Sequence, residues 1–149
     1  MDKATKPTKA STVKRDWHLV DLKEKNLGRT ATEIAKFLMG KAKPYFVRNL
    51  DCGDYVVVVN AQYVSVTGKK DEKKKYYRYS GYPGGLRAQT LGDLRKRKPE
   101  EIIYHAVKGM LPQNKLRDSM LGRLFVFPKE EHTYQDKFKN QKSKIKSTN

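Results

Sequence analysis

The run D-Y-V-V-V-V-N at residues 54–60 decides the fold. Four consecutive β-branched valines favour an extended strand, and an unbroken apolar run is typical of a strand that is buried on both faces. W-H-L-V-D at 17–21 and R-L-F-V-F at 123–127 predict two further strands. We therefore expect a sheet with residues 54–60 in its interior.

Helical segments lie between these strands. Apolar residues spaced three and four apart predict a helix over residues 30–39. Thr30 and Glu33 have the spacing of a capping box at its start, and Gly40 is placed to end it. The remaining predicted elements are strands over 63–67 and 76–79 and helices over 90–98, 99–108 and 114–121, with Gly109 ending the helix over 99–108. Helices and strands that alternate around a buried strand predict an α/β domain with a mostly parallel or mixed sheet.

Length and composition limit the possible classes of protein. The chain has 149 residues, which is enough for one domain. No apolar run approaches the roughly 20 residues of a transmembrane helix. Cys52 is the only cysteine, which excludes a disulfide scaffold and fits a reducing compartment. Residues 1–16 are polar and carry Asp2, so they are typical neither of a secretory signal nor of a transit peptide.

The chain carries a large excess of positive charge. It has 33 Lys and Arg residues against 16 Asp and Glu, a formal net charge of +17. Residues 17–128 alone hold 22 basic and 11 acidic residues, so the excess is spread along the chain. A folded unit with this charge repels itself unless an anion neutralises it, and nucleic acid is the commonest such partner. The alternatives are an anionic membrane surface, which is disfavoured because the Lys-rich segments lack an amphipathic apolar face, and a merely soluble basic protein.

The charge and composition also divide the chain. Residues 1–16 form a basic N-terminal arm, residues 17–132 a single α/β domain, and residues 133–149 a Lys-rich C-terminal arm. We expect residues 1–16 and 137–149 to be disordered until they bind a partner, because they contain few large apolar residues.

Two basic runs are candidate RNA contacts. K-K-D-E-K-K-K at 69–75 precedes Y-Y-R-Y at 76–79, and lysines supply point charges to phosphates while tyrosines stack on bases. The alternative is a solvated loop followed by a strand with core tyrosines. R-K-R-K at 95–98 follows a predicted helix, where one or two cations would complement the helix dipole. A run of four cations exceeds what the helix dipole needs and therefore favours contact with RNA or another anion.

Two glycine-containing segments are candidate phosphate sites. In G-Y-P-G-G-L-R at 81–87, the glycines let a backbone approach phosphates closely, although no G-K-[ST] follows and the segment is not a P-loop. An ordinary turn is the alternative. Gly28-Arg29 precedes the predicted helix, where free amides and a guanidinium favour an anion. Alternatively, Arg29 pairs with Asp21 or Asp54.

The sequence offers little for catalysis. The three histidines lack metal-ligand spacing, and Cys52 has no partner cysteine. Asp51 and Asp54 are close enough in sequence for acid–base or metal chemistry, as in an RNA-processing enzyme, but shaping the turn before the valine strand is the favoured interpretation. We expect no enzymatic activity, no cofactor, no metal and no small-molecule substrate.

Seven motifs, in order and at compatible spacing, resemble one family. They are W-H-L-V-D at 17–21, L-G-R-T-A-T-E-I-A at 27–35, G-K-A-K-P-Y-F at 40–46, G-D-Y-V-V-V-V-N-A at 53–61, V-T-G-K-K at 66–70, K-Y-Y-R-Y-S-G-Y-P-G-G-L-R at 75–87 and A-V-K-G-M-L-P at 106–112. Residues 13–132 resemble bacterial-type large-subunit ribosomal protein thirteen. The sequence departs from that family at Arg117-Asp118, where a Gly-Arg pair is usual, and at His132-Thr133-Tyr134, where His-x-His is common.

The resemblance implies a three-layer α/β/α fold with basic extended termini. It also implies a non-catalytic cytoplasmic protein of the ribosome that binds and organises large-subunit rRNA early in assembly, beside neighbouring large-subunit proteins. An organelle ribosome is a less favoured location, and an off-ribosome RNA- or DNA-binding regulator is the alternative function. Segments 81–87 and 107–112 are the RNA-facing elements that the resemblance implies.

The candidate RNA-binding residues come from these runs and motifs. They are Arg29, Lys41, Lys43, Lys69, Lys70, Lys73, Lys74, Lys75, Arg78, Tyr82, Gly84, Gly85, Arg87, Arg95, Lys96, Arg97, Lys98, Lys108, Met110, Lys115 and Arg123.

Overall fold

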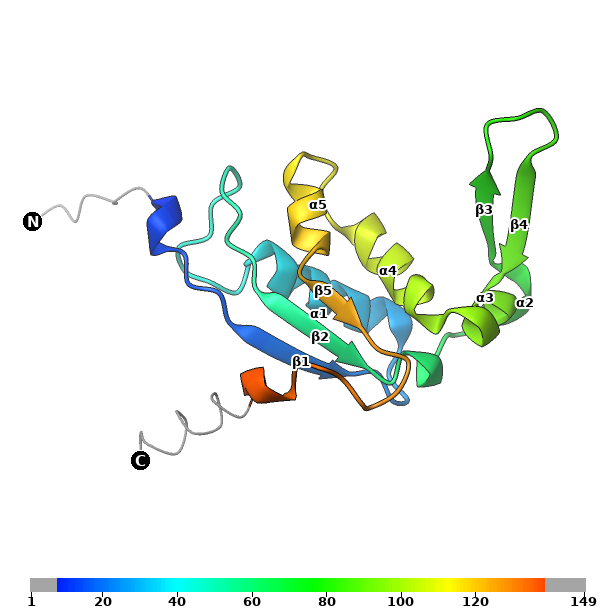
Figure 1. The fold of residues 1–149 in the computed structure, drawn as a ribbon, viewed down its shortest axis with the longest axis horizontal. Coiled ribbons are helices and arrows are strands. Elements are labelled where there is room, and N and C mark those ends of the chain that lie inside the picture. Colours follow the sequence, from blue (N-terminus) through cyan, green and yellow to red (C-terminus); the bar gives the residue numbers. More distant parts are fainter. Residues whose placement is uncertain (1–7, 139–149) are drawn as a thin grey trace, which may run out of the picture.

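The main sheet of the computed structural model, which describes residues 8–138, has three parallel strands (Figure 1). They are β1 (Trp17–Asp21), β2 (Tyr55–Val59) and β5 (Leu124–Val126), in the order β1-β2-β5. Val58 of the central strand pairs with Val20 on one side and Val126 on the other. The three valines at 56–58 are fully buried, which confirms the prediction of a buried central strand.

Helices cover one face of this sheet. α1 (Leu27–Met39) and α4 (Pro99–Met110) pack against each other and against the strands, and α5 (Leu116–Leu121) lies beside them (Figure 1). Ile34 and Leu38 of α1 and Ile102 of α4 are fully buried in the same cluster as Val56 and Val58. The helix stripes predicted from apolar spacing therefore form the core, and the α/β prediction is confirmed.

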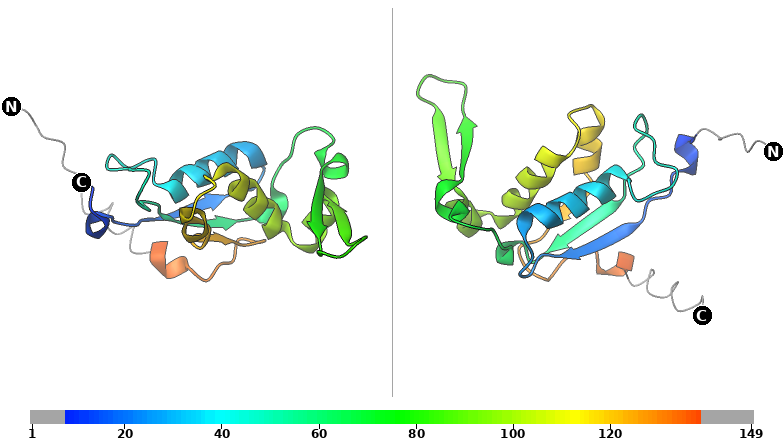
Figure 2. Two further views of the ribbon diagram at one scale, coloured as in Figure 1. Left: turned by 90° about the horizontal axis from the view of Figure 1, so that it is seen from above. Right: turned by 180° about the vertical axis from the view of Figure 1, so that it is seen from behind.

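Aromatic residues cover the opposite face. Trp17 stacks on Tyr55 with ring centroids 4.5 Å apart, and Tyr134 and Phe138 lie 5.2 and 6.4 Å from Trp17. Figure 2 shows this C-terminal segment on the side of the sheet away from α1 and α4. The C-terminal arm from residue 133 therefore packs on the sheet as far as Phe138, because its aromatic rings lie against Trp17, and the expectation of disorder from residue 137 is wrong for residues 137 and 138. Residues 139–149 lie outside the described residues.

The described part of the N-terminal arm is also held in place. Residues 8–16, with the short 3-10 helix η1 (Ala10–Thr12), contact the loop between α1 and β2. Thr8 Oγ1 donates to the Tyr45 carbonyl at 3.0 Å, and the Tyr45 hydroxyl donates to the Lys14 carbonyl at 3.2 Å. The expectation of a disordered arm is therefore wrong for residues 8–16, whose polar groups find partners on the domain.

A second, two-stranded sheet forms an antiparallel hairpin of β3 (Lys75–Tyr79) and β4 (Leu86–Thr90). The hairpin projects from the body of the molecule, and the short helix α2 (Lys70–Lys73) and α3 (Leu91–Arg97) lie at its base (Figures 1 and 2). Residues 69–75 were expected to be a loop, and β4 was not predicted, because L-R-A-Q-T lacks the apolar pattern of a strand.

Three element predictions require correction. α1 begins at Leu27, where the Asn26 side chain caps it by accepting from the Gly28 amide at 3.1 Å, so the predicted capping box is wrong. Residues 63–67 do not form a strand: the 3-10 helix η2 (Ala61–Tyr63) precedes a single bridge between Asn26 and Ser65. Apolar and polar residues alternate over 63–67 because the segment packs on the core, but it has no strand partner. α4 continues through Gly109 to Met110, whereas Gly40 does end α1.

Candidate nucleic-acid interface

The tip of the β3–β4 hairpin is an exposed turn. Its backbone is closed by hydrogen bonds from the Ser80 amide to the Gly85 carbonyl at 3.2 Å and from the Gly85 amide to the Tyr82 carbonyl at 2.9 Å. Gly81 and Gly84 have φ values of 91° and 72°, which side chains rarely adopt. A Cβ at either position would meet no atom within 4 Å. The glycine-rich segment thus presents its backbone to open space.

Large aromatic side chains on the hairpin face solvent. Tyr77, Tyr79 and Tyr82 are 66%, 63% and 76% exposed. Tyr76 alone among the tyrosines of β3 packs against the core, and burial raises its pKa above the usual value. The alternative of a strand with core tyrosines therefore holds for one ring in three. Clustered exposed aromatic residues are typical of a binding surface.

Cations lie along this hairpin and around its base. We call them the hairpin cation cluster: Lys69, Lys70, Lys73, Lys74, Lys75, Arg78, Arg87, Lys96, Arg97 and Lys98, all exposed. They come from α2, β3, β4, α3 and the residues that flank these helices. Glu101 lies 3.4 Å from Lys98, an exposed ion pair of little energetic weight. The fold therefore brings both predicted basic runs and the glycine-rich turn to one end of the molecule.

Arg95 belongs to the same run but has a structural role. Its guanidinium lies 3.2 Å from an Asp71 carboxylate oxygen and donates to the Val64 carbonyl at 3.2 Å. These contacts tie α3 to α2 and to the segment after η2. Arg95 is therefore less available to a ligand than its exposed neighbours Lys96 and Arg97.

The other exposed candidates lie on the helical body. Lys108 and Met110 are at the end of α4, and Met110 Sδ accepts from Thr32 Oγ1 of α1 at 3.6 Å. Arg29 is exposed in the first turn of α1. Lys41 follows α1 and lines a cavity with Pro112 and Asn114 of the α4–α5 connection, and the exposed Lys115 comes next in that connection. These residues lie on α1, α4 and the connections that follow them and not on the hairpin, α2 or α3.

Helix capping changes the interpretation of Gly28-Arg29. The Gly28 amide, which was expected to be free for an anion, already donates to the Asn26 side chain at 3.1 Å. Asp21 accepts from Asn60 and Asp54 from His18, and within residues 8–138 neither aspartate forms an ion pair with Arg29. Arg29 remains available as an exposed cation.

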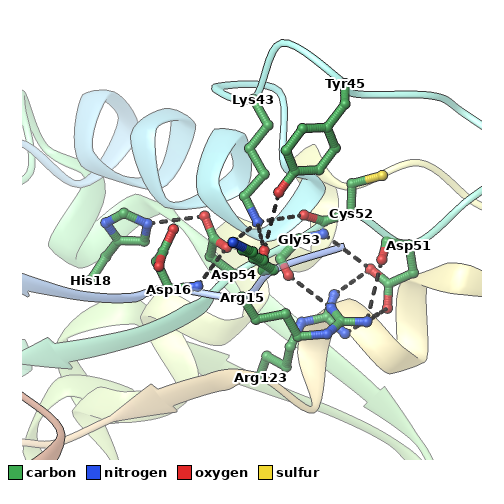
Figure 3. Close-up of polar contacts among 11 residues, drawn as sticks. Arg15, Asp16, His18, Lys43, Tyr45, Asp51, Cys52, Gly53, Asp54 and Arg123 are labelled. Atoms are coloured by element: carbon green, nitrogen blue, oxygen red, sulfur yellow. Dashed lines mark hydrogen bonds and ion pairs between the residues drawn. The ribbon is translucent and has the colours of Figure 1, made fainter. Parts of the chain in front are cut away.

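Arg123 is buried and paired. Its guanidinium donates to both oxygens of Asp51 at 2.6 and 2.5 Å, and its side chain is 9% exposed (Figure 3). Arg15 reaches the same carboxylate at 3.6 Å and donates to the Gly53 carbonyl at 2.8 Å. Arg123 therefore joins β5 to the loop before β2, and its prediction as an RNA contact is withdrawn because no donor faces solvent freely.

Lys43 is enclosed in the same region. Its ammonium bonds to a carboxylate oxygen of Asp54 and donates to the Cys52 carbonyl at 3.0 Å, and its side chain is 9% exposed (Figure 3). Asp54 also accepts from His18 Nε2 and from the Asp16 amide, each at 3.0 Å. The prediction of RNA contact by Lys43 is withdrawn for the same reason.

This network gives Asp51 and Asp54 a structural role. Burial by itself would raise the pKa of Asp54, but hydrogen bonds from His18, Lys43 and the Asp16 amide outweigh it and hold that pKa below its usual value. A carboxylate held in the charged form by a buried ammonium and by hydrogen bonds is poorly placed for proton transfer. Within residues 8–138, no three His, Cys, Asp or Glu side chains are grouped so as to hold a metal ion.

Sequence reasoning missed three residues of the exposed surface. Tyr77 and Tyr79 flank Arg78 on β3. Because side chains of a strand alternate between its two faces, this spacing could have predicted that both tyrosines point to the face opposite Arg78. Arg48 is exposed and lines the same cavity as Lys41. Nothing in the sequence around Arg48 distinguishes it from other exposed cations.

No helix within residues 8–138 combines the length and apolar character that a membrane span requires. The fold and the surface together define the class of this protein. It is a basic α/β protein with a projecting hairpin that carries exposed tyrosines and cations.

Comparison with known proteins agrees with this class. The model of the family "Ribosomal protein L13" matches residues 15–133. A protein of Dehalococcoides mccartyi, named large ribosomal subunit protein uL13, is 56% identical over 130 residues, which cover 87% of this chain and 91% of that protein. Proteins of the same name from Aquifex aeolicus and Clostridioides difficile are 53% and 52% identical over 127 and 126 residues, each pair covering 85% of this chain and 88% of the relative. This chain belongs to the ribosomal protein L13 family.

Proposed function

We propose that this protein is a structural component of the large ribosomal subunit that binds and organises large-subunit rRNA. Its relatives are named as large-subunit proteins, which supports the location. The projecting hairpin carries the proposal for RNA: Tyr77, Tyr79 and Tyr82 are exposed beside the hairpin cation cluster. Stacking and phosphate neutralisation are the two interactions that such a surface supplies to RNA.

The two ends of the molecule suggest how rRNA is organised. The hairpin cation cluster lies at one end, and the exposed Arg29, Lys41, Lys108, Met110 and Lys115 lie on the helical body. The proposed mechanism is that separate rRNA segments contact these two surfaces and are held at a fixed distance by the rigid core between them. Binding early in assembly, and contacts with neighbouring large-subunit proteins, are parts of this proposal that rest on the family resemblance.

Sedimentation tests the location. A lysate of cells that contain this protein is run through a sucrose gradient before and after a high-salt wash, and the protein is quantified by mass spectrometry. We expect one copy per large subunit, retained after the wash, and the same copy number in precursor particles. Recovery of the protein only in the top fractions would reject the proposal in favour of an off-ribosome regulator.

A further inference from the structure

A cavity of about 600 Å³ lies between the hairpin and α4. This volume is within the range of about 300–1,000 Å³ that is typical of ligand pockets. Its lining includes the rings of Tyr76, Tyr104 and His105, the guanidinium groups of Arg78 and Arg87, and the amide of Gln89. The cavity is separate from the exposed tip of the hairpin and from the network around Asp51 and Asp54.

The aromatic part of the cavity is built from both elements. Tyr76 of β3 and His105 of α4 have ring centroids 5.4 Å apart, and Tyr104 packs edge-on to His105 at 6.4 Å. Tyr76 packs against the core, whereas Tyr104 is 38% exposed. The exposed ring of Tyr104, which lines the cavity, therefore offers a surface on which a flat ligand would stack.

The charged part of the cavity carries positive charge that an anion would neutralise. Arg78 and Arg87 are directly opposite each other in the register of β3 and β4, and like charges in that arrangement destabilise a sheet. Within residues 8–138, neither guanidinium has an ion-pair partner. Lys74, which does not line the cavity, places its ammonium 5.3 Å from the centre of the Tyr76 ring. A phosphate between the two arginines would remove the repulsion.

We propose that this cavity binds one unpaired nucleotide of an RNA chain, with the base stacked on the ring of Tyr104, near Tyr76 and His105, and a phosphate between Arg78 and Arg87. Gln89 and Glu101 supply hydrogen-bonding groups for the edge of the base. Paired RNA would use the arginines but not the rings, because its bases stay stacked within the helix. The inference rests on the proposed RNA binding and names the part of the RNA that this cavity takes.

The test measures binding of the full chain to a transcript of large-subunit rRNA over a range of salt concentrations. We expect Tyr104→Ala and Tyr104→Leu to bind about 5- to 150-fold more weakly, the range for loss of one stacked base, with the same salt dependence. Tyr104→Phe keeps the ring and should bind like the wild type. Arg78→Ala should lower both the affinity and the slope of log K against log salt, by about 0.7–0.9. Tyr63→Ala, which removes an exposed tyrosine outside the cavity, is the matched control.

A second readout locates the base. Photo-crosslinking of bound rRNA that contains thiolated nucleotides should join a single nucleotide to a peptide with Tyr76, Tyr104 or His105. Wild-type affinity in both Tyr104→Ala and Tyr104→Leu, or crosslinks only outside the cavity, would overturn the inference while leaving RNA binding intact. Binding of adenosine monophosphate at the cavity, with those crosslinks absent, would overturn it in favour of a free-nucleotide site. A wild-type protein that does not bind the transcript would instead refute the proposed function.

Discussion

The guanidinium of Arg123 donates to both carboxylate oxygens of Asp51, with N–O distances of 2.6 and 2.5 Å. The two residues are 72 positions apart in the sequence. Their pairing fixes the start of β5 against the loop that leads into β2 (Figure 3). A residue that looks in the sequence like one more cation for RNA is therefore part of the framework.

Removal of this pairing should destabilise the protein. Arg123→Ala leaves the carboxylate of Asp51 with only the distant Arg15 as a cation, and loss of one partner of a largely buried pair costs about 3 kcal/mol. Arg123→Lys retains one donor and should cost less. Urea unfolding measures both free energies of unfolding. An Arg123→Lys protein with wild-type stability but weakened rRNA binding would contradict the structural role.

Asp54 should make the stability of the protein depend on pH. The pKa of Asp54 in the folded protein lies below its ordinary value of 3.8, so the stability it contributes is present above that value and is lost as pH falls through the folded pKa. Asp54→Asn leaves the Lys43 ammonium enclosed without a carboxylate, and should lower the free energy of unfolding at neutral pH by about 3 kcal/mol.

Urea unfolding of the wild type and of Asp54→Asn at several pH values checks the direction of this pH dependence. The difference between the two proteins should be constant from neutral pH down to about pH 5 and should shrink below about pH 4. Glu24→Gln, at an exposed carboxylate with no ion pair among the described residues, is the control. A difference that stays the same across the whole range would show that ionisation of Asp54 is not linked to folding.

Three lysines of the hairpin cation cluster should contribute to RNA affinity without affecting folding. Lys73, Lys74 and Lys75 are exposed and form no ion pair within residues 8–138. Their joint replacement by Ala should weaken binding to an rRNA transcript and reduce the slope of log K against log salt by about 2–3, because each phosphate contact contributes about 0.7–0.9. Filter binding measures both quantities. The double variant Lys23→Ala/Lys25→Ala, which changes two exposed lysines outside the hairpin cation cluster, serves as the control. An unchanged affinity and slope in the triple variant would remove these lysines from the interface.

Two glycines should respond in opposite ways to replacement by Ala. A Cβ at Gly53 would lie 1.8 Å from the Leu38 carbonyl oxygen, so Gly53→Ala forces the loop before β2 away from α1 and should prevent stable folding. A Cβ at Gly109 would meet no atom within 4 Å, so Gly109→Ala should stabilise α4 by about 0.5–1 kcal/mol. Thermal unfolding compares the two.

Gly109 also tests the RNA-facing role of residues 107–112. If RNA approaches this part of α4 closely, Gly109→Ala should weaken rRNA binding while it raises stability. A stabilised protein with unchanged affinity would show that RNA does not lie against this turn of the helix.

The sequence predicted the elements whose signal is local. The valine run predicts β2 because it is β-branched and apolar over its whole length, and α1 follows from its apolar stripe. β4 could not be predicted, since residues 86–90 become a strand only by pairing with β3 across a tight turn. The strand predicted over 63–67 does not form, because a local pattern alone is not sufficient. Its alternation places Val64 inward, but no neighbouring strand is available for pairing.

The candidate site was predictable to a similar degree. The exposed lysines and the glycine-rich turn were identified because runs of cations and glycines are visible in the sequence. Lys43 and Arg123 were misjudged because their partners, Asp54 and Asp51, are adjacent only in the fold. The cavity between the hairpin and α4 was not foreseen, because its rings and arginines come from segments that meet only when β3 packs beside α4.

The central claim is that the hairpin end of the molecule lies against rRNA in the large subunit. Cys52 is the only cysteine and is fully buried, so a cysteine introduced at Ser80 can be labelled selectively with an iron chelate that generates hydroxyl radicals. Labelled Ser80→Cys protein is incorporated into large subunits, and strand cleavage of the rRNA is mapped, with wild-type protein as the background control. We predict cleavage at a few discrete rRNA positions around the hairpin tip. Incorporation of the labelled protein without any cleavage above background would contradict the account.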